Sequence, residues 1–277
     1  MGVVLALAVI LFIVIVMWPN TATPRAPLQS VSATPLATQL NDAETIEYLT
    51  VLQRVEPVAA GELHKQADAA IASGAEKDEL AMLVLGAMGD DLEGAHEVLF
   101  KADVKYFDKV LNVTKIGLAR LSKRSPKFCR TSHYESLANS NPEDALTEFM
   151  AMLKYDSAGY QFALKLNQVL LEGIEDGRKS PNKYGRLNTK DEQSLQALVI
   201  RMTKNPKLAN VMRIQSLPPA EQVQAMRSLN VCEISSEVIS GVLGLPQDTK
   251  KRLMGEMNRM AKSGEFDGSL QDMASGL

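Results

Sequence analysis

The sequence lacks the motifs by which many enzymes and nucleotide-binding proteins are recognised. No GxxxxGK(S/T) phosphate loop, GxGxxG turn, GxSxG elbow or HExxH pair is present. Only three histidines occur among the 277 residues, so a histidine-rich metal site is poorly supplied. We therefore predict no cofactor and no metal ion, and no motif is specific enough to indicate a resemblance to a known family.

One pair of residues has a spacing found in metal sites. Glu93 and His96 stand three residues apart, like the Glu-x-x-His pairs of carboxylate-bridged di-metal bundles. Those sites need two such pairs and two further glutamates, and no second pair exists in this chain. We favour an acidic helix start, which the helix macrodipole stabilises.

An excess of charge of one sign is also missing. The 30 basic and 33 acidic side chains leave a net charge of −3, which gives no strong whole-protein field for collecting nucleic acid. Aromatic residues make up only 5% of the chain, and no nucleic-acid recognition motif is present. We predict no nucleic-acid partner. The 45% share of apolar residues is sufficient for a globular core.

Long hydrophobic runs are absent except at the amino terminus. Residues 3–18 are sixteen apolar residues without a charge, which would form a helix of about 24 Å. A hydrocarbon core of about 30 Å can thin to match such a helix. A cleaved signal peptide and a buried core helix are the alternatives. No Lys or Arg precedes the run and the following residues make a poor cleavage site, so we predict an uncleaved transmembrane signal-anchor over residues 1–18.

Two segments with different patterns follow this run. Residues 19–40 contain four prolines among Thr, Ser and Ala and show no apolar periodicity, which predicts a flexible linker. In residues 41–277 apolar residues recur at intervals of three and four, and no segment alternates as a strand does. We therefore predict a soluble all-α domain, built as a multi-helix bundle or an irregular helical array.

Local sequence patterns place some helix boundaries. Pro142, Pro206 and Pro219 lie at or near the first turn of a helix. Thr189 and Glu192 have the spacing of a capping box. The longest break in the helical pattern is 176–188, which we interpret as a loop within one domain.

The chain has only two cysteines, Cys129 and Cys232, and neither has a metal-ligand spacing. They either form a disulfide that closes a loop of about 100 residues in an oxidising compartment, or remain two unrelated buried thiols in a cytosolic domain. The positive-inside comparison nearly ties, because Arg25 is the only basic residue close to the predicted span. We expect the domain on the periplasmic or another extracytoplasmic side.

Three reactive side chains lie within seven residues: Cys129, His133 and Glu135. On one helix Cys129 and His133 would share a face, and the imidazole could activate the thiol as a nucleophile. Pro126 and the nearby Ser and Thr residues favour instead a turn that leads into a helix, and a disulfide would silence the nucleophile. A catalytic thiol therefore stays the alternative interpretation.

A basic stretch is the third candidate site. No acidic residue lies between Asp108 and Glu135, and six residues of this interval form the stretch: Lys115, Arg120, Lys123, Arg124, Lys127 and Arg130. Such a patch attracts anions and would bind an anionic lipid or polymer, an acidic protein, or an acidic segment of a second copy. A solvated helix face is the simpler alternative.

From these patterns we expect a single-pass, membrane-anchored interaction or assembly protein. Its helical domain would bind a protein partner in an envelope or membrane complex, or a second copy of itself. The alternative is a membrane-anchored hydrolase or thiol-dependent enzyme that uses Cys129, His133 and Glu135.

Overall fold

The computed structural model describes residues 34–90, 95–138, 141–215 and 217–263, and its helices in these ranges form an all-α fold without strands. The prediction of an all-α domain is therefore confirmed for this part of the chain. The predicted transmembrane helix, residues 1–18, lies outside the described residues. Among the described helices, none has both the length and the apolar character that crossing a membrane requires.

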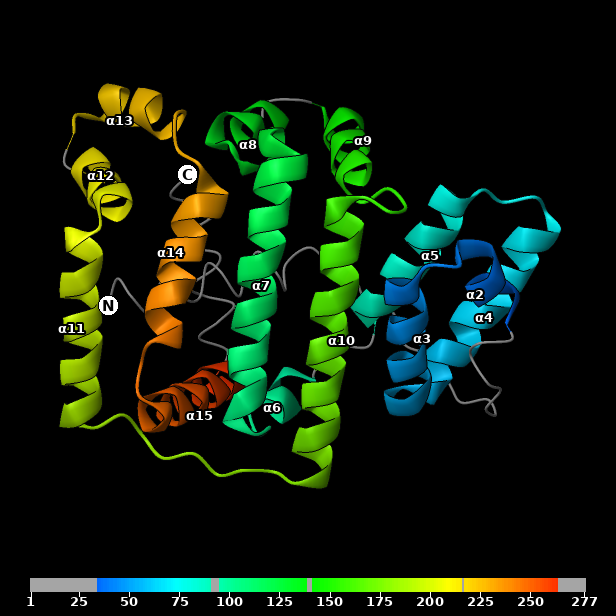
Figure 1. Cartoon of the computed structure of the whole chain (residues 1–277), viewed down its shortest axis with the longest axis horizontal. Coiled ribbons are helices and arrows are strands. Elements are labelled where there is room, and N and C mark those ends of the chain that lie inside the picture. Colours follow the sequence, from blue (N-terminus) through cyan, green and yellow to red (C-terminus); the bar gives the residue numbers. More distant parts are fainter. Residues whose placement is uncertain (1–33, 91–94, 139–140, 216, 264–277) are drawn as a thin grey trace.

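Four helices form a unit at the amino-terminal end of the described chain: α2 (Pro35–Leu40), α3 (Ala43–Val55), α4 (Pro57–Ala72) and α5 (Lys77–Asp90) (Figure 1). Thr34 and Asp42 begin the first two helices, because each side chain accepts a hydrogen bond from the backbone amide three residues ahead. Apolar side chains from all four helices share one core with Tyr160 and Leu164 of the later helix α10 (Ala158–Lys179).

The linker predicted over residues 19–40 ends earlier than expected. Its last six residues form α2, and Leu36, Ala37 and Leu40 are buried in the core of the amino-terminal unit. A helix of six residues is unstable in water on its own, so this helix depends on burial against α4 and α5. The rest of the predicted linker, residues 19–33, lies outside the described residues.

Five helices lie side by side in one row (Figure 1). In order they are α3, α10, α7 (Val104–Arg124), α14 (Val231–Leu243) and α11 (Thr189–Lys204). α10 packs against α3 and α7, and α7 packs against α14, so α7 lies at the centre of the row. The architecture is the irregular helical array that we expected as one of two forms.

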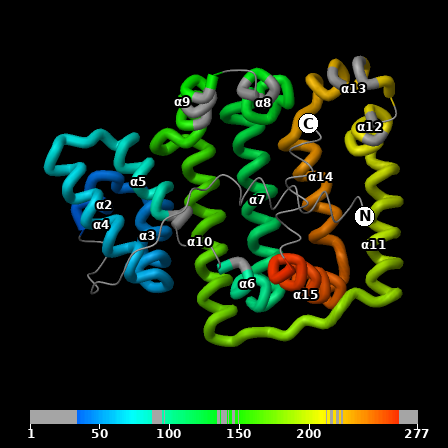
Figure 2. Tube along the Cα trace, turned by 180° about the vertical axis from the view of Figure 1, so that it is seen from behind, coloured from blue at the N-terminus to red at the C-terminus, as the bar shows by residue number. Residues whose placement is uncertain are grey.

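Further elements lie at the two ends of the helices that form the row. α6 (His96–Leu99) and α15 (Gln247–Ser263) pack together at one end, with contacts to α10 and α7. Figure 2, seen from behind, shows α15 crossing the row at this end. The other end carries η2, a 3-10 helix, and four α-helices. Their bounds are Pro126–Cys129 for η2, Thr131–Ala138 for α8, Pro142–Met152 for α9, Pro206–Gln215 for α12 and Pro219–Met226 for α13.

A second core holds α7, α11, α14 and α15 together. Phe107 and Leu111 of α7 meet Leu198, Ile239 and other buried side chains of the neighbouring helices. Glycine lets helices approach closely at several crossings. At Gly117 of α7 an added Cβ would overlap the ring of Phe162 on α10, so a larger residue here would push the two central helices apart.

Two predicted boundaries need correction. The capping box of α11 begins at Asn188 with Asp191 as its partner, one residue before the predicted pair of Thr189 and Glu192. The loop predicted over 176–188 is shorter, because α10 continues to Lys179. In contrast, the helices predicted to begin near Pro142, Pro206 and Pro219 do begin at these prolines.

Candidate functional site

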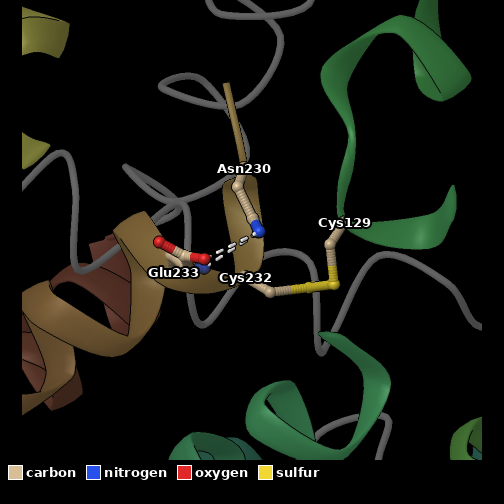
Figure 3. The surroundings of a disulfide bond; sticks show 4 residues. All are labelled: Cys129, Asn230, Cys232 and Glu233. Carbon is tan, nitrogen blue, oxygen red and sulfur yellow. Dashed lines mark hydrogen bonds between the residues drawn. A yellow bond between two sulfur atoms is a disulfide. The ribbon is translucent and has the colours of Figure 1, made fainter. Parts of the chain in front are cut away.

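A disulfide joins Cys129 and Cys232 (Figure 3). Cys129 ends η2, which follows the carboxyl end of α7, and Cys232 lies in the first turn of α14. The two Cα atoms are 5.1 Å apart, although 103 positions separate the residues in the sequence. Both side chains are buried, in a small cluster with Leu121 and Ala158. The structure thus pairs the two cysteines, and no described cysteine is a free thiol.

Backbone contacts hold the two segments together beside this disulfide. Arg130 and Asn230 form an isolated antiparallel bridge, and the Thr131 amide donates a hydrogen bond to the Leu229 carbonyl at 3.3 Å. Asn230 begins α14 by accepting a hydrogen bond from the Glu233 amide, and its own amide group donates to the Glu233 carboxylate (Figure 3). The sulfur atoms therefore lie in a structured joint between α7 and α14.

The proposed thiol cluster does not form in this structure. Cys129 belongs to η2 and His133 to α8, and the extended backbone of Arg130 between them prevents a shared helix face. The His133 ring instead packs edge-on against Phe128, with ring centroids 5.1 Å apart. Glu135 lies in α8, but its side chain is outside the described part. A disulfide sulfur has no thiolate, so the disulfide form offers no nucleophile at Cys129.

The first part of the basic stretch lies on the solvent side of α7, where Arg120 and Lys123 share a face and Lys115 and Arg124 lie on its two flanks. Arg120, Lys123 and Arg124 are exposed and Lys115 is half-buried, and none of the four makes an ion pair or hydrogen bond with a described residue. Ile116, in the same part of the helix, is 55% exposed. We call these five residues the α7 basic face.

The last two residues of the basic stretch have different surroundings. The Lys127 ammonium donates a hydrogen bond of 2.7 Å to Glu148 of α9, and this bond lowers the pKa of the Glu148 carboxyl. Arg130 is exposed, but its backbone is part of the bridge to Asn230. The structure therefore does not bring all six predicted residues into one unpaired patch.

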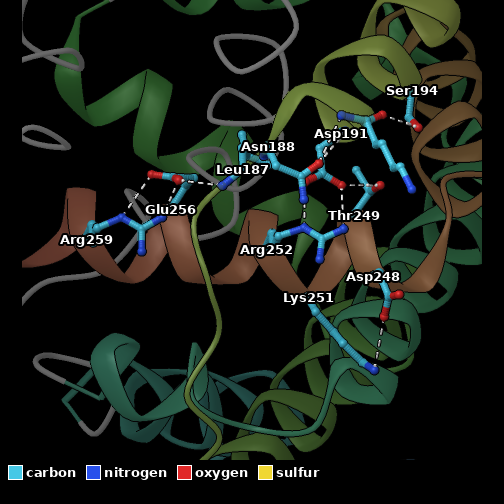
Figure 4. A network of polar contacts seen from close by, with 11 residues as sticks. Leu187, Asn188, Asp191, Ser194, Asp248, Thr249, Lys251, Arg252, Glu256 and Arg259 are labelled. Carbon is cyan, nitrogen blue, oxygen red and sulfur yellow. Dashed lines mark hydrogen bonds and ion pairs between the residues drawn. The ribbon is translucent and has the colours of Figure 1, made fainter.

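A polar network that the sequence analysis missed joins α11 to α15 (Figure 4). The Asp191 side chain is only 1% exposed and receives two hydrogen bonds from the Arg252 guanidinium, at 2.5 and 2.9 Å. The Thr249 hydroxyl and the Asn188 amide also donate to it. These donors, Arg252 first, lower the pKa of Asp191 to about 2. Asp191 is recognisable in the sequence as an acidic residue of a helix start, but nothing local indicates a partner 61 residues away.

Further polar contacts at α15 are structural as well. Glu256 accepts a hydrogen bond from the Leu187 amide and pairs with Arg259, as Figure 4 shows. Lys250 is almost fully buried and donates to Asp108 of α7 at 2.7 Å. These charges are paired with one another, so the network stabilises α15 rather than offering a binding site.

No metal site occurs among the described residues, and the groove described below is open to solvent. No cluster of three or more His, Cys, Asp or Glu side chains has metal-binding geometry there. Of the Glu93–His96 pair, Glu93 lies outside the described residues. An open groove of about 490 Å³ runs along α12, and Lys207, Asn210 and Arg213 are its polar lining residues. Lys207 in this groove already pairs with Glu233, so the described lining contains no pair of catalytic acid and base.

No family model, curated protein or solved structure matches this chain. A fold class by itself does not determine function, so function has to be inferred from the residues and their surroundings.

Proposed function

We propose that this chain is a single-pass, membrane-anchored interaction or assembly protein. Its helical domain lies on the periplasmic or another extracytoplasmic side and binds a protein partner of an envelope or membrane complex, or a second copy of itself. The observation that carries the proposal is the Cys129–Cys232 disulfide. Disulfides persist in oxidising compartments and are rare in the cytosol.

The order of segments along the chain supports an anchored domain. The apolar run 3–18 is followed by residues 19–34, which separate it from the first helix of the core. At about 3.1 Å per residue, an extended proline-containing segment of this length reaches about 50 Å. Such a tether allows the domain to meet a partner close to the membrane while the anchor stays in place.

The surface of the domain suits binding better than catalysis. Many of its described charged side chains form ion pairs, and the α12 groove is open to solvent along one helix. Enclosed, largely apolar pockets are typical of sites for small-molecule substrates. The extended row of helices provides broad faces instead, which are the form of most protein interfaces.

The side of the membrane is tested by labelling an introduced cysteine in intact cells. Ile200 is 55% exposed on α11, so Ile200→Cys places an accessible thiol on the surface, whereas the buried native cysteines stay unreactive. We expect a membrane-impermeant maleimide to label Ile200→Cys before lysis. Labelling only after lysis would contradict the proposed location. The unsubstituted chain is the control for labelling at other sites.

The redox state is measured separately on the unsubstituted chain. Cells are quenched in acid, the protein is denatured, and its thiols are alkylated with and without prior reduction. We expect alkylation of Cys129 and Cys232 only after reduction. Free thiols without reduction would contradict an oxidising compartment.

A thiol-dependent enzyme is the second candidate, because the His133 ring packs against Phe128, which is the residue before Cys129 in the sequence. Two variants separate the candidates. Cys129→Ser and Cys232→Ser both break the disulfide, but only the first removes the supposed nucleophile. If cellular function is lost in Cys129→Ser and kept in Cys232→Ser, the result supports the enzyme. Equal effects of both variants support a structural disulfide in a binding protein.

A further inference from the structure

The exposed side of α7 lies at the centre of the row. Phe107, Leu111, Thr114, Gly117 and Leu121 are buried on one side of the helix. The opposite side carries Asn112, Ile116, Arg120 and Lys123, which follow one another at intervals of four, four and three residues and are all exposed. This spacing places the four on one helix face. The flanking helices α10 and α14 pack along the buried side.

The basic side chains of α7 differ in their ion pairs between the two halves of the helix. In the first half, Lys105 pairs with Asp176 and Lys109 with Glu172, both on α10. In the second half, Lys115, Arg120, Lys123 and Arg124 have no such partner among the described residues. Four unpaired positive charges therefore lie along ten residues, or about 14 Å of helix. Their complement is a surface with a high density of negative charge.

An exposed apolar side chain lies within this charge cluster. Ile116 is one of only three large apolar side chains that are strongly exposed among the described residues. Cations around an exposed aliphatic group suit the interface of an anionic bilayer, since the cations meet phosphates while the aliphatic group enters the acyl boundary. An acidic protein would satisfy the charges but would leave Ile116 without such a site.

The shape of the face favours a bilayer over a peptide. The open groove described above is lined by α12 and not by the α7 basic face. A bilayer surface needs no pocket to receive it. A tether of sixteen residues, whose reach is at most about 50 Å, would also keep the domain near its own membrane and raise the effective concentration of the surface.

We propose that the α7 basic face binds the anionic phospholipid surface of the membrane that carries the predicted anchor. This inference rests on the proposed function, because that function supplies the anchor. The domain would lie with α7 against the bilayer and would leave the opposite side of the row to a protein partner.

The test uses the full chain, labelled at one of two matched positions with an environment-sensitive dye. Ile116→Cys reports on the α7 basic face. Ile200→Cys is the control, because Ile200 is equally exposed, also 55%, but lies on the edge helix α11. The chain is mixed with vesicles of phosphatidylcholine, with or without phosphatidylglycerol, and with brominated lipids as quenchers. Flotation of the vesicles measures association, and the dye measures contact at its own position.

We expect both labelled chains to float with both kinds of vesicle through the predicted anchor. The dye at position 116 should shift to the blue and be quenched only on vesicles that contain phosphatidylglycerol. This response should disappear at high salt, because salt screens exposed charges. The dye at position 200 should remain in water under every condition.

A pair of double variants tests the charges directly. Arg120→Gln/Lys123→Gln removes two charges of the face, and Arg201→Gln/Lys204→Gln removes the same two residue types at the same spacing near the end of α11. Each basic residue near an anionic surface contributes about 1 kcal/mol, so the first variant should lower the equilibrium constant for contact at position 116 about 30-fold. The second should leave it unchanged.

The outcomes separate this inference from the proposed function. Flotation without a response at position 116 supports the anchor and overturns the binding of α7 to lipid. Flotation only with phosphatidylglycerol, lost on Arg120→Gln/Lys123→Gln, supports binding of the α7 basic face to anionic lipid but overturns the anchor, and with it the inference that the face binds the membrane of its own anchor. No flotation with either vesicle overturns both. A response to soluble polyglutamate but not to anionic vesicles overturns the inference and indicates an acidic protein as the partner of this face.

Discussion

Removal of the Cys129–Cys232 disulfide should destabilise the domain by several kcal/mol. The residues are 103 positions apart, and the closed loop contains α10, the helix that packs between α3 and α7. In the chain-entropy model a loop of this length lowers the entropy of the unfolded chain by about 16 cal/mol/K, or about 4.7 kcal/mol at 25 °C. Most globular domains are stable by only about 5–15 kcal/mol, so this is a large part of the total.

The measurement is urea denaturation followed by circular dichroism. It compares the oxidised chain, the reduced chain and the double variant Cys129→Ala/Cys232→Ala. Alanine is preferred to serine, because a hydroxyl group in this buried cluster would add its own desolvation cost. With an m-value of about 3 kcal/mol/M, the expected loss moves the midpoint by about 1.5 M urea.

The oxidised and reduced forms also provide an internal control. Reduction removes the cross-link without changing a residue, so the reduced chain and the double variant should unfold at similar urea concentrations. Equal midpoints for the oxidised and reduced chains would refute the stabilisation argued from loop length. A low midpoint for the double variant alone would assign the loss to packing of the side chains at these positions.

Three further predictions concern the contacts of α15 and α10. Asp191→Asn should lower the free energy of unfolding by about 2–3 kcal/mol, measured by urea denaturation, since Arg252 loses a buried partner. The pKa of Asp191 is lowered from 3.8 to about 2, so its contribution is complete above pH 4 and is lost as the pH falls through 2. This pH-dependent part of the stability is about 1–2 kcal/mol, because solvent screens the charge of the partly exposed Arg252. Asp191→Asn removes the titrating carboxyl group, so the free energy of unfolding should fall by that much less as the pH is lowered below 4. Gly177→Leu should lower the melting temperature, at a cost of about 1–3 kcal/mol, because a Cβ there would overlap the Val98 carbonyl; an unchanged melting temperature would refute this close approach.

Much of the fold was predictable because its determinants are local. Proline cannot donate a backbone hydrogen bond, which makes it well suited to the first turn, and Pro142, Pro206 and Pro219 each begin a helix as predicted. The capping box of α11 was misplaced by one residue, because Asn188 and Thr189 are both good caps. The buried position of Asp191, the partner of Asn188, decides between them.

Other features depend on contacts that sequence periodicity does not contain. Gly177 resembles a helix breaker in the sequence, yet it lies inside α10, where the lack of a side chain allows Val98 to approach. α2 follows a proline-containing segment and is stabilised by the burial of Leu36 and Leu40. Both boundaries follow from packing between segments that are distant in the sequence.

The candidate site divides in the same way. The even cysteine count allowed a disulfide, but the sequence does not show that the two cysteines are neighbours. They meet because the end of η2 lies beside the first turn of α14. The composition of the basic stretch was evident, whereas its separation into unpaired residues on α7 and a paired Lys127 requires the position of Glu148. The partnership of Asp191 and Arg252 joins two different helices and has no local sequence pattern.

The disulfide and the α7 basic face lie close together in the sequence, and the packing assigns them different tasks. Arg124 ends α7, and Cys129 follows five residues later at the end of η2. α7 itself is held along its length by α10 and by α14, through buried residues such as Leu111 and Ile239. The cross-link therefore fixes the joint beyond the helix end, while the presentation of Arg120 and Lys123 depends on helix packing. Leu121 of α7 also packs against the disulfide, but α10 and α14 hold the helix along its length. Loss of the disulfide should therefore lower the stability of the whole domain without turning the α7 basic face away from a bound surface.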